Sequence, residues 1–216
     1  EIGSKISKPL LIEKPVVTRL VDVQKLLQFA KEYRSPIWVA MEYRYMPILQ
    51  EFLAKVKPVT GKVEMLSIRE HRYPFLKKVD NWNRFNKLTG GTFVEKCCHF
   101  FDLMRLITSS EPVQVMASGG QACNHLAETY KGKKADIWDS GYVLVDFENG
   151  TRSMLELCMF ADTSKYQEEI SAIGKLGKIE AKIIGPKRFW HKNLGNQPRS
   201  KLVINKRFKK MILEKK

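Results

Sequence analysis

The segment GGTFVEKCCHFFD, residues 90–102, is the one around which the rest of this chain is organised. Its glycine pair allows a sharp turn or a close approach to a ligand, and the apolar run after it predicts a helix to about Leu106. On that helix Glu95 and His99 are four residues apart and share a face, with Asp102 three residues further along. A carboxylate beside an imidazole is a usual pattern for general acid–base chemistry, although the same spacing is common in helices without a catalytic role.

The length and composition indicate a folded protein without a membrane span. A chain of 216 residues can form one large domain or one and a half ordinary ones, and 44% hydrophobic residues are enough for a core. No uninterrupted apolar run reaches about 18 residues, which excludes a transmembrane helix. The first residues lack the basic-then-apolar pattern of a signal peptide, so we expect a cytoplasmic protein with no membrane partner.

The positive charge is concentrated at the C-terminus. The chain has a formal net charge of +15, and residues 187–216 carry about two thirds of it. This distribution indicates a basic tail rather than a basic fold, and because periodicity is also lost there, we expect the tail to be poorly ordered. No recognition-helix or base-stacking motif accompanies it. A nucleic-acid partner is therefore not expected, and association through the tail is the weaker alternative.

The cysteines do not predict a metal site. Cys97, Cys98, Cys123 and Cys158 show no CxxC spacing, and the adjacent pair would point about 100° apart on a helix. We expect reduced thiols and no bound metal.

The first 46 residues predict a βαβ unit. Residues 8–12 and 37–41 are short apolar runs typical of buried strands, and between them an amphipathic pattern predicts a helix ending near Tyr33. Two apolar strands joined by a helix imply a parallel pair. Because one βαβ unit cannot cover both faces of a parallel sheet, the pattern also predicts further structure upstream.

Residues 47–186 predict a different architecture, a mostly antiparallel sheet backed by helices. A helix is expected at residues 47–55 and a strand at 63–73, where Leu66 and Val63 point to opposite faces. A Glu-Asn-Gly sequence is a strong hairpin signal between two of the later strands. The further strands are expected at residues 113–119, 140–147, 151–160, 168–174 and 178–184.

Five separated motifs follow one another in a single order along most of the chain. They are EKP at 13–15, YRYMP at 43–47, GGTFVEKCCHFFD at 90–102, DFENG at 146–150 and IGKLGKIE at 173–180. Together they resemble the Gfo/Idh/MocA family of NAD(P)-dependent oxidoreductases, which includes glucose-fructose oxidoreductase and inositol 2-dehydrogenase. Glu95 stands where the family pattern has aspartate. The sequences WNRF and EKCCH, beginning at Trp82 and Glu95, resemble an inositol 2-dehydrogenase-like subgroup.

The resemblance implies an α+β fold in two parts. Residues 1–46 would be the C-terminal remnant of a dinucleotide-binding Rossmann domain, and residues 47–186 the family's substrate and oligomerisation domain. The implied cofactor is NAD or NADP. Its binding would involve Arg44, which could equally pair with a carboxylate, and the three residues of the EKP motif, Glu13, Lys14 and Pro15.

The resemblance also implies catalytic roles. Lys14 would stabilise the developing alkoxide, and His99 would take the hydroxyl proton as hydride leaves for the nicotinamide. Glu95 would orient His99 or hydrogen-bond a neighbouring substrate hydroxyl. The substrate site implied by the resemblance would consist of His99 together with Trp82, Asn83 and Asp102, although the tryptophan could equally belong to the core.

The chain departs from the family pattern at both ends. It contains no G-x-G-x-x-G motif for the pyrophosphate, begins at what resembles the fifth strand of the Rossmann fold, and ends in the basic tail. One hypothesis is a portion of an oxidoreductase that transfers hydride between NAD(P) and a sugar or inositol-like polyol, inactive as this chain alone. The alternative is a catalytically silent binding or oligomerisation module. A homo-oligomer is expected in either case, because the family's sheet face commonly mediates dimers.

Overall fold

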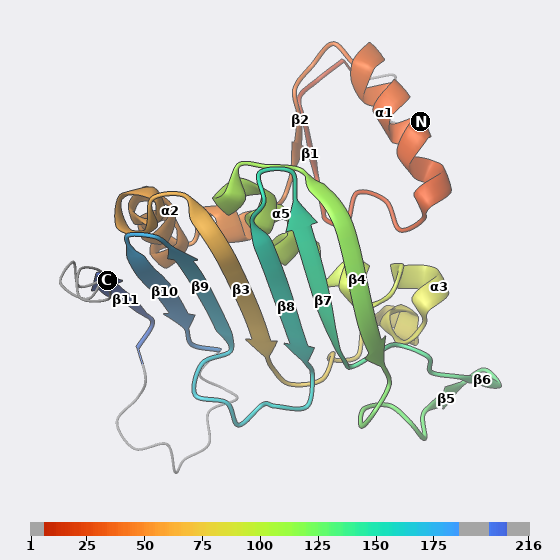
Figure 1. The fold of residues 1–216 in the computed structure, drawn as a ribbon. Helices are drawn as coiled ribbons and strands as arrows, with labels where there is room; N and C mark the ends of the chain where they lie inside the picture. Colours follow the sequence, from red (N-terminus) through yellow and green to blue (C-terminus); the bar gives the residue numbers. More distant parts are fainter. Residues whose placement is uncertain (1–6, 186–198, 207–216) are drawn as a thin grey trace.

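The computed structural model describes residues 7–185 and 199–206. Within them a seven-stranded sheet runs in the order β11-β10-β9-β3-β8-β7-β4, and two small sheets pair β1 with β2 and β5 with β6 (Figure 1). The strands are β1 (Leu10–Ile12), β2 (Ile37–Val39), β3 (Val63–His71), β4 (Pro112–Gly120), β5 (Thr129–Tyr130), β6 (Lys133–Lys134), β7 (Ser140–Phe147), β8 (Arg152–Cys158), β9 (Glu168–Gly174), β10 (Gly177–Ile183) and β11 (Lys201–Lys206). The α-helices are α1 (Val23–Glu32), α2 (Pro47–Thr60), α3 (Asn86–Thr89), α4 (Thr92–Glu95) and α5 (Cys98–Thr108), and the 3-10 helices are η2 (Leu20–Asp22), η3 (Glu42–Tyr45) and η4 (Val79–Arg84).

The N-terminal segment forms the predicted βαβ unit. Strand β1 pairs with β2 in parallel, with Leu10 opposite Ile37, and α1 connects them. No residue of α1 is buried, and Leu11 and Trp38 of the two strands are largely exposed. The expectation that both strands are buried is therefore wrong for this chain. Figure 1 shows this unit at the edge of the molecule, away from the large sheet. A domain boundary near Met46 stays a prediction.

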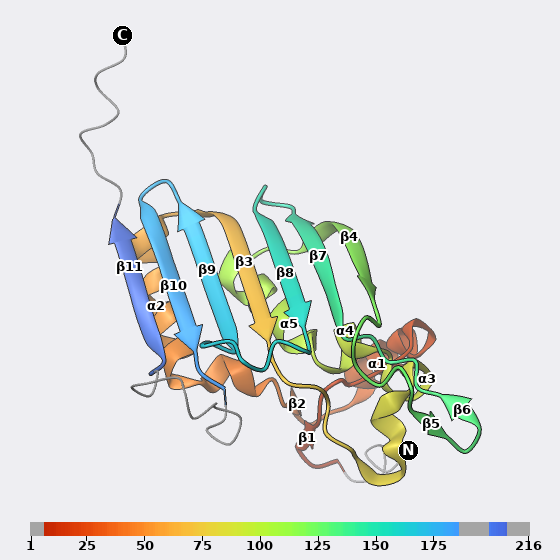
Figure 2. The same cartoon turned by 90° about the horizontal axis from the view of Figure 1, so that it is seen from below.

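The large sheet is mostly antiparallel, as the sequence predicted, with one parallel pair. Strand β3 lies between β8, with which it is parallel, and β9, with which it is antiparallel. Helices α2 and α5 cover one face and leave the other open (Figure 2). The period-2 alternation of the strands points Ile68, Leu155 and Ile170 toward those helices, where they are completely buried beside Phe52 and Phe100.

The prediction of a poorly ordered tail is wrong for residues 201–206, which form β11 at the edge of the sheet. Leu202 lies opposite Ala181, and Ile204 lies opposite Ile179. The two apolar residues are two apart and share a face, but the surrounding lysines obscured this short alternation. Of the rest of the expected tail, residues 199–200 lead into β11, and residues 187–198 and 207–216 lie outside the described residues.

Two smaller expectations are also corrected. Helix α2 continues past residue 55 to Thr60, because Val56 and Val59 extend its buried face and Pro58 is accommodated in the last turn. In β3, Val63 is buried although it was expected to face away from Leu66, since a bulge between Val63 and Met65 shifts the register against β9. In the described part of the chain, no helix is both long and apolar enough to cross a membrane.

Candidate active site

The glycine-led segment folds into two short helices rather than one. Gly90 adopts a left-handed conformation (φ +78°) that ends α3, and α4 and α5 are separated by a turn at Lys96 and Cys97. A Cβ atom at Gly90 would lie 2.9 Å from the carbonyl oxygen of Thr18, so no side chain fits there. The prediction of one continuous helix is therefore wrong. Glu95 is the last residue of α4, whereas His99 lies in α5.

The helix break brings Lys14 into the site. Its Nζ donates a hydrogen bond to the backbone carbonyl of Glu95 (2.7 Å) and lies 3.4 Å from Glu95 Oε1. The carbonyl is available because it stands at the interruption between α4 and α5. Two residues 81 positions apart therefore meet as the motif register implied. The other Glu95 oxygen, Oε2, is buried and has no hydrogen-bond partner among the described residues.

His99 lies in the first turn of α5 with its side chain only 2% exposed. Its ring centroid is 4.7 Å from that of Tyr43, and Nε2 lies 3.3 Å from Glu42 Oε1. Nδ1 is buried without a partner in the described part of the chain. Burial, followed by the charges of Lys14 and Lys96, lowers the pKa of His99 to about 3. The imidazole is therefore neutral near pH 7 and has a lone pair with which to accept a proton.

A cluster of buried charged side chains adjoins the imidazole. Lys96 Nζ donates a hydrogen bond to Tyr43 Oη (2.9 Å) and lies 3.2 Å from Glu70 Oε1. Tyr43 Oη donates to Glu168 Oε1 (2.9 Å), and Arg72 lies 3.3 Å from Glu70 Oε1. Burial, then the charge of Glu70, raises the pKa of Glu168. The cluster fixes the tyrosine ring that packs on the imidazole.

None of these cluster residues was proposed from the sequence, although one carried a signal. Glu70 alternates with Leu66 and Ile68 on a single strand face, so its position predicts a buried carboxylate that needs cationic partners. Lys96 carried no comparable signal. Its burial depends on the turn that separates α4 from α5.

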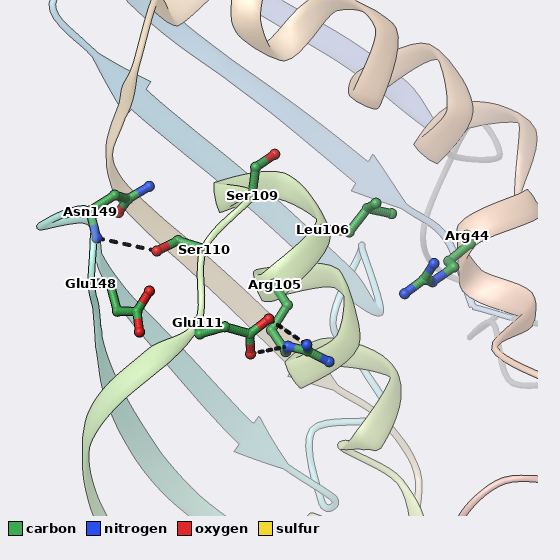
Figure 3. Close-up of a pocket in the computed structure, with 8 residues that line it drawn as sticks. All are labelled: Arg44, Arg105, Leu106, Ser109, Ser110, Glu111, Glu148 and Asn149. Carbon is green, nitrogen blue, oxygen red and sulfur yellow. Dashed lines mark hydrogen bonds and ion pairs between the residues drawn. The ribbon is translucent and has the colours of Figure 1, made fainter. Parts of the chain in front are cut away.

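Arg44 was predicted at the cofactor site and Asp102 at the substrate site. In the structure the two side chains bind each other. The guanidinium makes two hydrogen bonds to the carboxylate, at 2.6 and 2.5 Å. Of the two alternatives for Arg44, the structure shows the carboxylate pairing. Arg44 also lines a pocket of about 650 Å³ at the end of α5, where Arg105 and Glu111 form a second paired contact at 2.8 and 2.5 Å (Figure 3). That pocket is lined by neither Lys14 nor His99.

Trp82 and Asn83 lie elsewhere. Asn83 is buried and donates through Nδ2 to the carbonyl of Leu76 (2.8 Å), which indicates a structural position. Trp82 is partly exposed and lines a separate pocket beside α3. A substrate role for either stays a prediction.

The residues at the carboxyl ends of β1 and β2 line a cavity with the character of a cofactor site. Val16, Val39 and Met41 line a cavity of about 420 Å³ that also contains the Arg44–Asp102 pair. Apolar walls with a few polar groups are typical of cofactor sites, and ligands of α/β folds bind beyond the carboxyl ends of parallel strands. Glu13 is exposed and Pro15 half-buried beside this edge.

Comparison with known proteins agrees with the resemblance. Residues 58–207 match the family description GFO_IDH_MocA_C, "Oxidoreductase family, C-terminal alpha/beta domain". The chain is 26% identical to a myo-inositol 2-dehydrogenase of Thermotoga maritima, over 82% of this chain and 50% of that protein. It is 30% identical to a myo-inositol dehydrogenase of Streptomyces leeuwenhoekii, over 80% of this chain and 50% of that protein. The chain thus spans about half the length of these curated relatives.

Solved structures share the fold at lower identity. The WlbA dehydrogenase from Bordetella pertussis, in complex with NADH and UDP-GlcNAcA, superposes with a TM-score of 0.64 at 17% identity, covering 79% of this chain and 51% of that one. The aldose-aldose oxidoreductase from Caulobacter crescentus, complexed with glycerol, superposes with a TM-score of 0.67 at 16% identity, covering 83% and 51%.

Proposed function

Because the chain belongs to the Gfo/Idh/MocA oxidoreductase family, we propose that it carries the acid–base residues for hydride transfer between NAD(P) and a hydroxyl of a sugar or polyol. The observation that supports this most directly is the contact of Lys14 with Glu95, the last residue of α4, three residues before the helix that holds His99 begins. A cation and a neutral imidazole on one side of the molecule are the groups that alcohol oxidation requires.

The proposed roles follow from the charges of the site. The neutral His99 accepts the substrate hydroxyl proton on its unprotonated ring nitrogen. The Lys14 ammonium stabilises the negative charge that develops on the substrate oxygen, and Glu95 holds that ammonium in place. When bound, the nicotinamide supplies the hydride acceptor. The buried and unpartnered Nδ1 and Oε2 atoms of His99 and Glu95 are consistent with partners that a ligand provides.

The proposed substrate is an inositol-like polyol or a sugar. Two relatives of similar length coverage are myo-inositol dehydrogenases, and one structural neighbour holds NADH with a sugar nucleotide. For this chain alone we propose neither tight dinucleotide binding nor turnover. Its 216 residues contain no G-x-G-x-x-G turn, and losing several pyrophosphate hydrogen bonds at about 1.5–3 kcal/mol each weakens binding by orders of magnitude.

The test uses this chain alone and a chimera in which a family Gly-rich half precedes Glu1. NADH binding is followed by fluorescence, and oxidation of myo-inositol and a panel of sugars by NADH formation. We expect weak binding by the chain alone, and chimera activity that falls at least about a hundredfold in Lys14→Met. Lys62→Met, which removes an exposed lysine paired with Glu64, is the matched control. Micromolar NADH affinity of the chain alone would contradict the proposal that tight dinucleotide binding needs the Gly-rich half.

A catalytically silent module is the second candidate, favoured by the open face of the large sheet. Met116, Leu144 and Met154 lie side by side across β4, β7 and β8 on that face. Such a row suits contact with a second copy of the chain. A chimera that binds NADH but oxidises no substrate in a Lys14-dependent way would favour this module over the enzyme.

A further inference from the structure

A second pocket, of about 780 Å³, lies between η4 with α3 on one side and the β5–β6 hairpin on the other. Figures 1 and 2 both show the hairpin next to α3, beyond the edge of the large sheet. Its walls include the rings of Trp82, Phe85 and Tyr130. The described lining contains neither Lys14 nor His99, so the pocket is separate from the candidate active site.

One wall of this pocket is held in place by a carboxylate. Glu128 accepts hydrogen bonds from Tyr130 Oη (2.6 Å) and Arg84 Nε (2.8 Å), and its other oxygen lies 3.0 Å from His125 Nδ1. Burial opposes ionisation of Glu128, but the bonds from Tyr130, His125 and Arg84 lower its pKa to about 2. The Phe85 ring packs edge-on against Tyr130 at 6.3 Å. The aromatic wall is therefore fixed before any ligand arrives.

Unfavourable backbone conformations flank the pocket on both sides. Asp80 and Asn81 have φ of +53° and +54°, and Lys131, in the hairpin turn, has φ of +50°. Positive φ values are uncommon for residues other than glycine, and positions of this kind cluster at ligand sites. All three residues line the pocket, Asp80 and Asn81 from η4 and Lys131 from the hairpin turn.

The rim of the pocket carries unpaired positive charge. Four lysines line it, and none of them pairs with a carboxylate in the described part of the chain. Some lysines elsewhere on the surface, such as Lys55, Lys62 and Lys178, contact a glutamate, and others, such as Lys57 and Lys175, are exposed without one among the described residues, so the rim differs in gathering four unpaired lysines around one cavity. The lining lysines are Lys87, Lys131, Lys133 and Lys134, against the carboxylates of Asp80 and Asp136. Lys133 is the cross-strand partner of Tyr130 and shares its face of the hairpin.

We propose that this pocket binds an anionic saccharide, a sugar that carries a carboxylate or a phosphate. The partly exposed Trp82 offers a flat apolar surface against which the C–H face of a sugar ring packs. The Asp80 carboxylate, which has no partner among the described residues, accepts hydroxyl hydrogens. Lys131 and Lys133 bind the acidic group. The volume is large enough for more than one ring.

The test measures binding to the purified chain by isothermal titration calorimetry. The probes are D-glucuronate, D-glucose 6-phosphate, neutral D-glucose and AMP. We expect at least one of the two acidic sugars to bind about tenfold or more tightly than glucose, and more weakly as salt is raised. The preferred acid identifies the carboxylate or the phosphate as the recognised group. Lys131→Gln with Lys133→Gln should weaken binding about tenfold or more, and Trp82→Ala should do the same, with partial recovery in Trp82→Phe.

Two controls locate the site. Lys57→Gln with Lys175→Gln removes two exposed lysines far from the pocket, on α2 and in the β9–β10 turn, and should change affinity less than about twofold. Lys14→Met should also leave binding intact, which separates this proposal from the proposed dehydrogenase function. Glucose or AMP binding as tightly as the acidic sugars would overturn the proposal. So would the absence of binding by either acidic sugar, or equal loss in the control pair.

Discussion

At the scale of single residues, Lys96 connects the buried charges to the imidazole. Replacing it by methionine removes the hydrogen bond donated to Tyr43 Oη, which keeps its bond to Glu168, and one of the two cations at Glu70. Because Glu70 is fully buried, we expect a loss of about 2–4 kcal/mol in the free energy of unfolding. The pKa of His99 should rise, since Lys96 is one of the charges that lower it.

Urea unfolding and an NMR titration of the imidazole measure the two effects of Lys96→Met. Lys62→Met is the matched control, because Lys62 forms an exposed pair with Glu64 and should contribute less than about 0.5 kcal/mol. A destabilised Lys96→Met protein with an unchanged His99 titration would show that the lysine has a structural role only.

His99 should make stability depend on pH. Its pKa is lowered from 6.5 to about 3 in the folded chain. Between these values the unfolded chain binds a proton that the folded chain does not, so the free energy of unfolding falls as pH falls, by at most about 1.4 kcal/mol per pH unit. Above about pH 6.5 the residue adds no slope. In His99→Gln the decline between pH 6.5 and 4.5 should be shallower, after the packing loss is subtracted at pH 8; parallel curves would contradict this.

The residues of the candidate site differ in how far the sequence predicted them. Lys14 and His99 belong to motifs with fixed spacing, and the structure brings Lys14 to Glu95, at the end of the helix that precedes the one holding His99. The carboxylate that Arg44 binds could not be chosen from its neighbours in sequence, because Asp102 is 58 residues away. Glu95 was expected beside His99, but its side chain contacts Lys14 instead.

At the scale of elements, the left-handed Gly90 decides where α3 ends and α4 begins. Gly90→Ala should destabilise the chain by about 2–4 kcal/mol, because it adds both backbone strain and a contact of 2.9 Å with the Thr18 carbonyl. Gly132→Ala is the matched control. Gly132 has a similar φ of +75° but nothing within 4 Å of the added Cβ, so only the strain of about 1 kcal/mol remains. Equal losses in urea unfolding would contradict the role of the close contact.

The strands were easier to predict than the helix boundaries. The β7–β8 and β9–β10 pairs follow from period-2 alternation around turn residues, which is local information. The interruption between α4 and α5 is stabilised by Lys14 from outside the segment, so the apolar period alone could not reveal it. Strand β11 was missed because it too depends on a contact outside its own segment, its pairing with β10.

At the scale of the whole molecule, the open sheet face predicts self-association. Leu144→Glu places a charge in the middle of the row formed with Met116 and Met154, and should shift the chain toward monomer. Leu20→Glu, on an exposed residue of η2 outside the large sheet, is the matched control and should leave the mass unchanged. Light scattering after size exclusion measures both. A wild-type chain that stays monomeric at about 50 μM would contradict self-association through the open sheet face.

The position of β3 has a consequence for the order of folding. This strand is made early in the chain, yet its neighbours in the sheet, β8 and β9, follow it by roughly 80 to 100 residues. The β7–β8 and β9–β10 hairpins close over short loops, so they should form first and receive β3 between them in a later step. Pulse-labelled hydrogen exchange during refolding should protect Leu155 and Ile179 before Ile68. During synthesis on the ribosome, β3 therefore remains without its sheet partners until β8 and β9 have been translated.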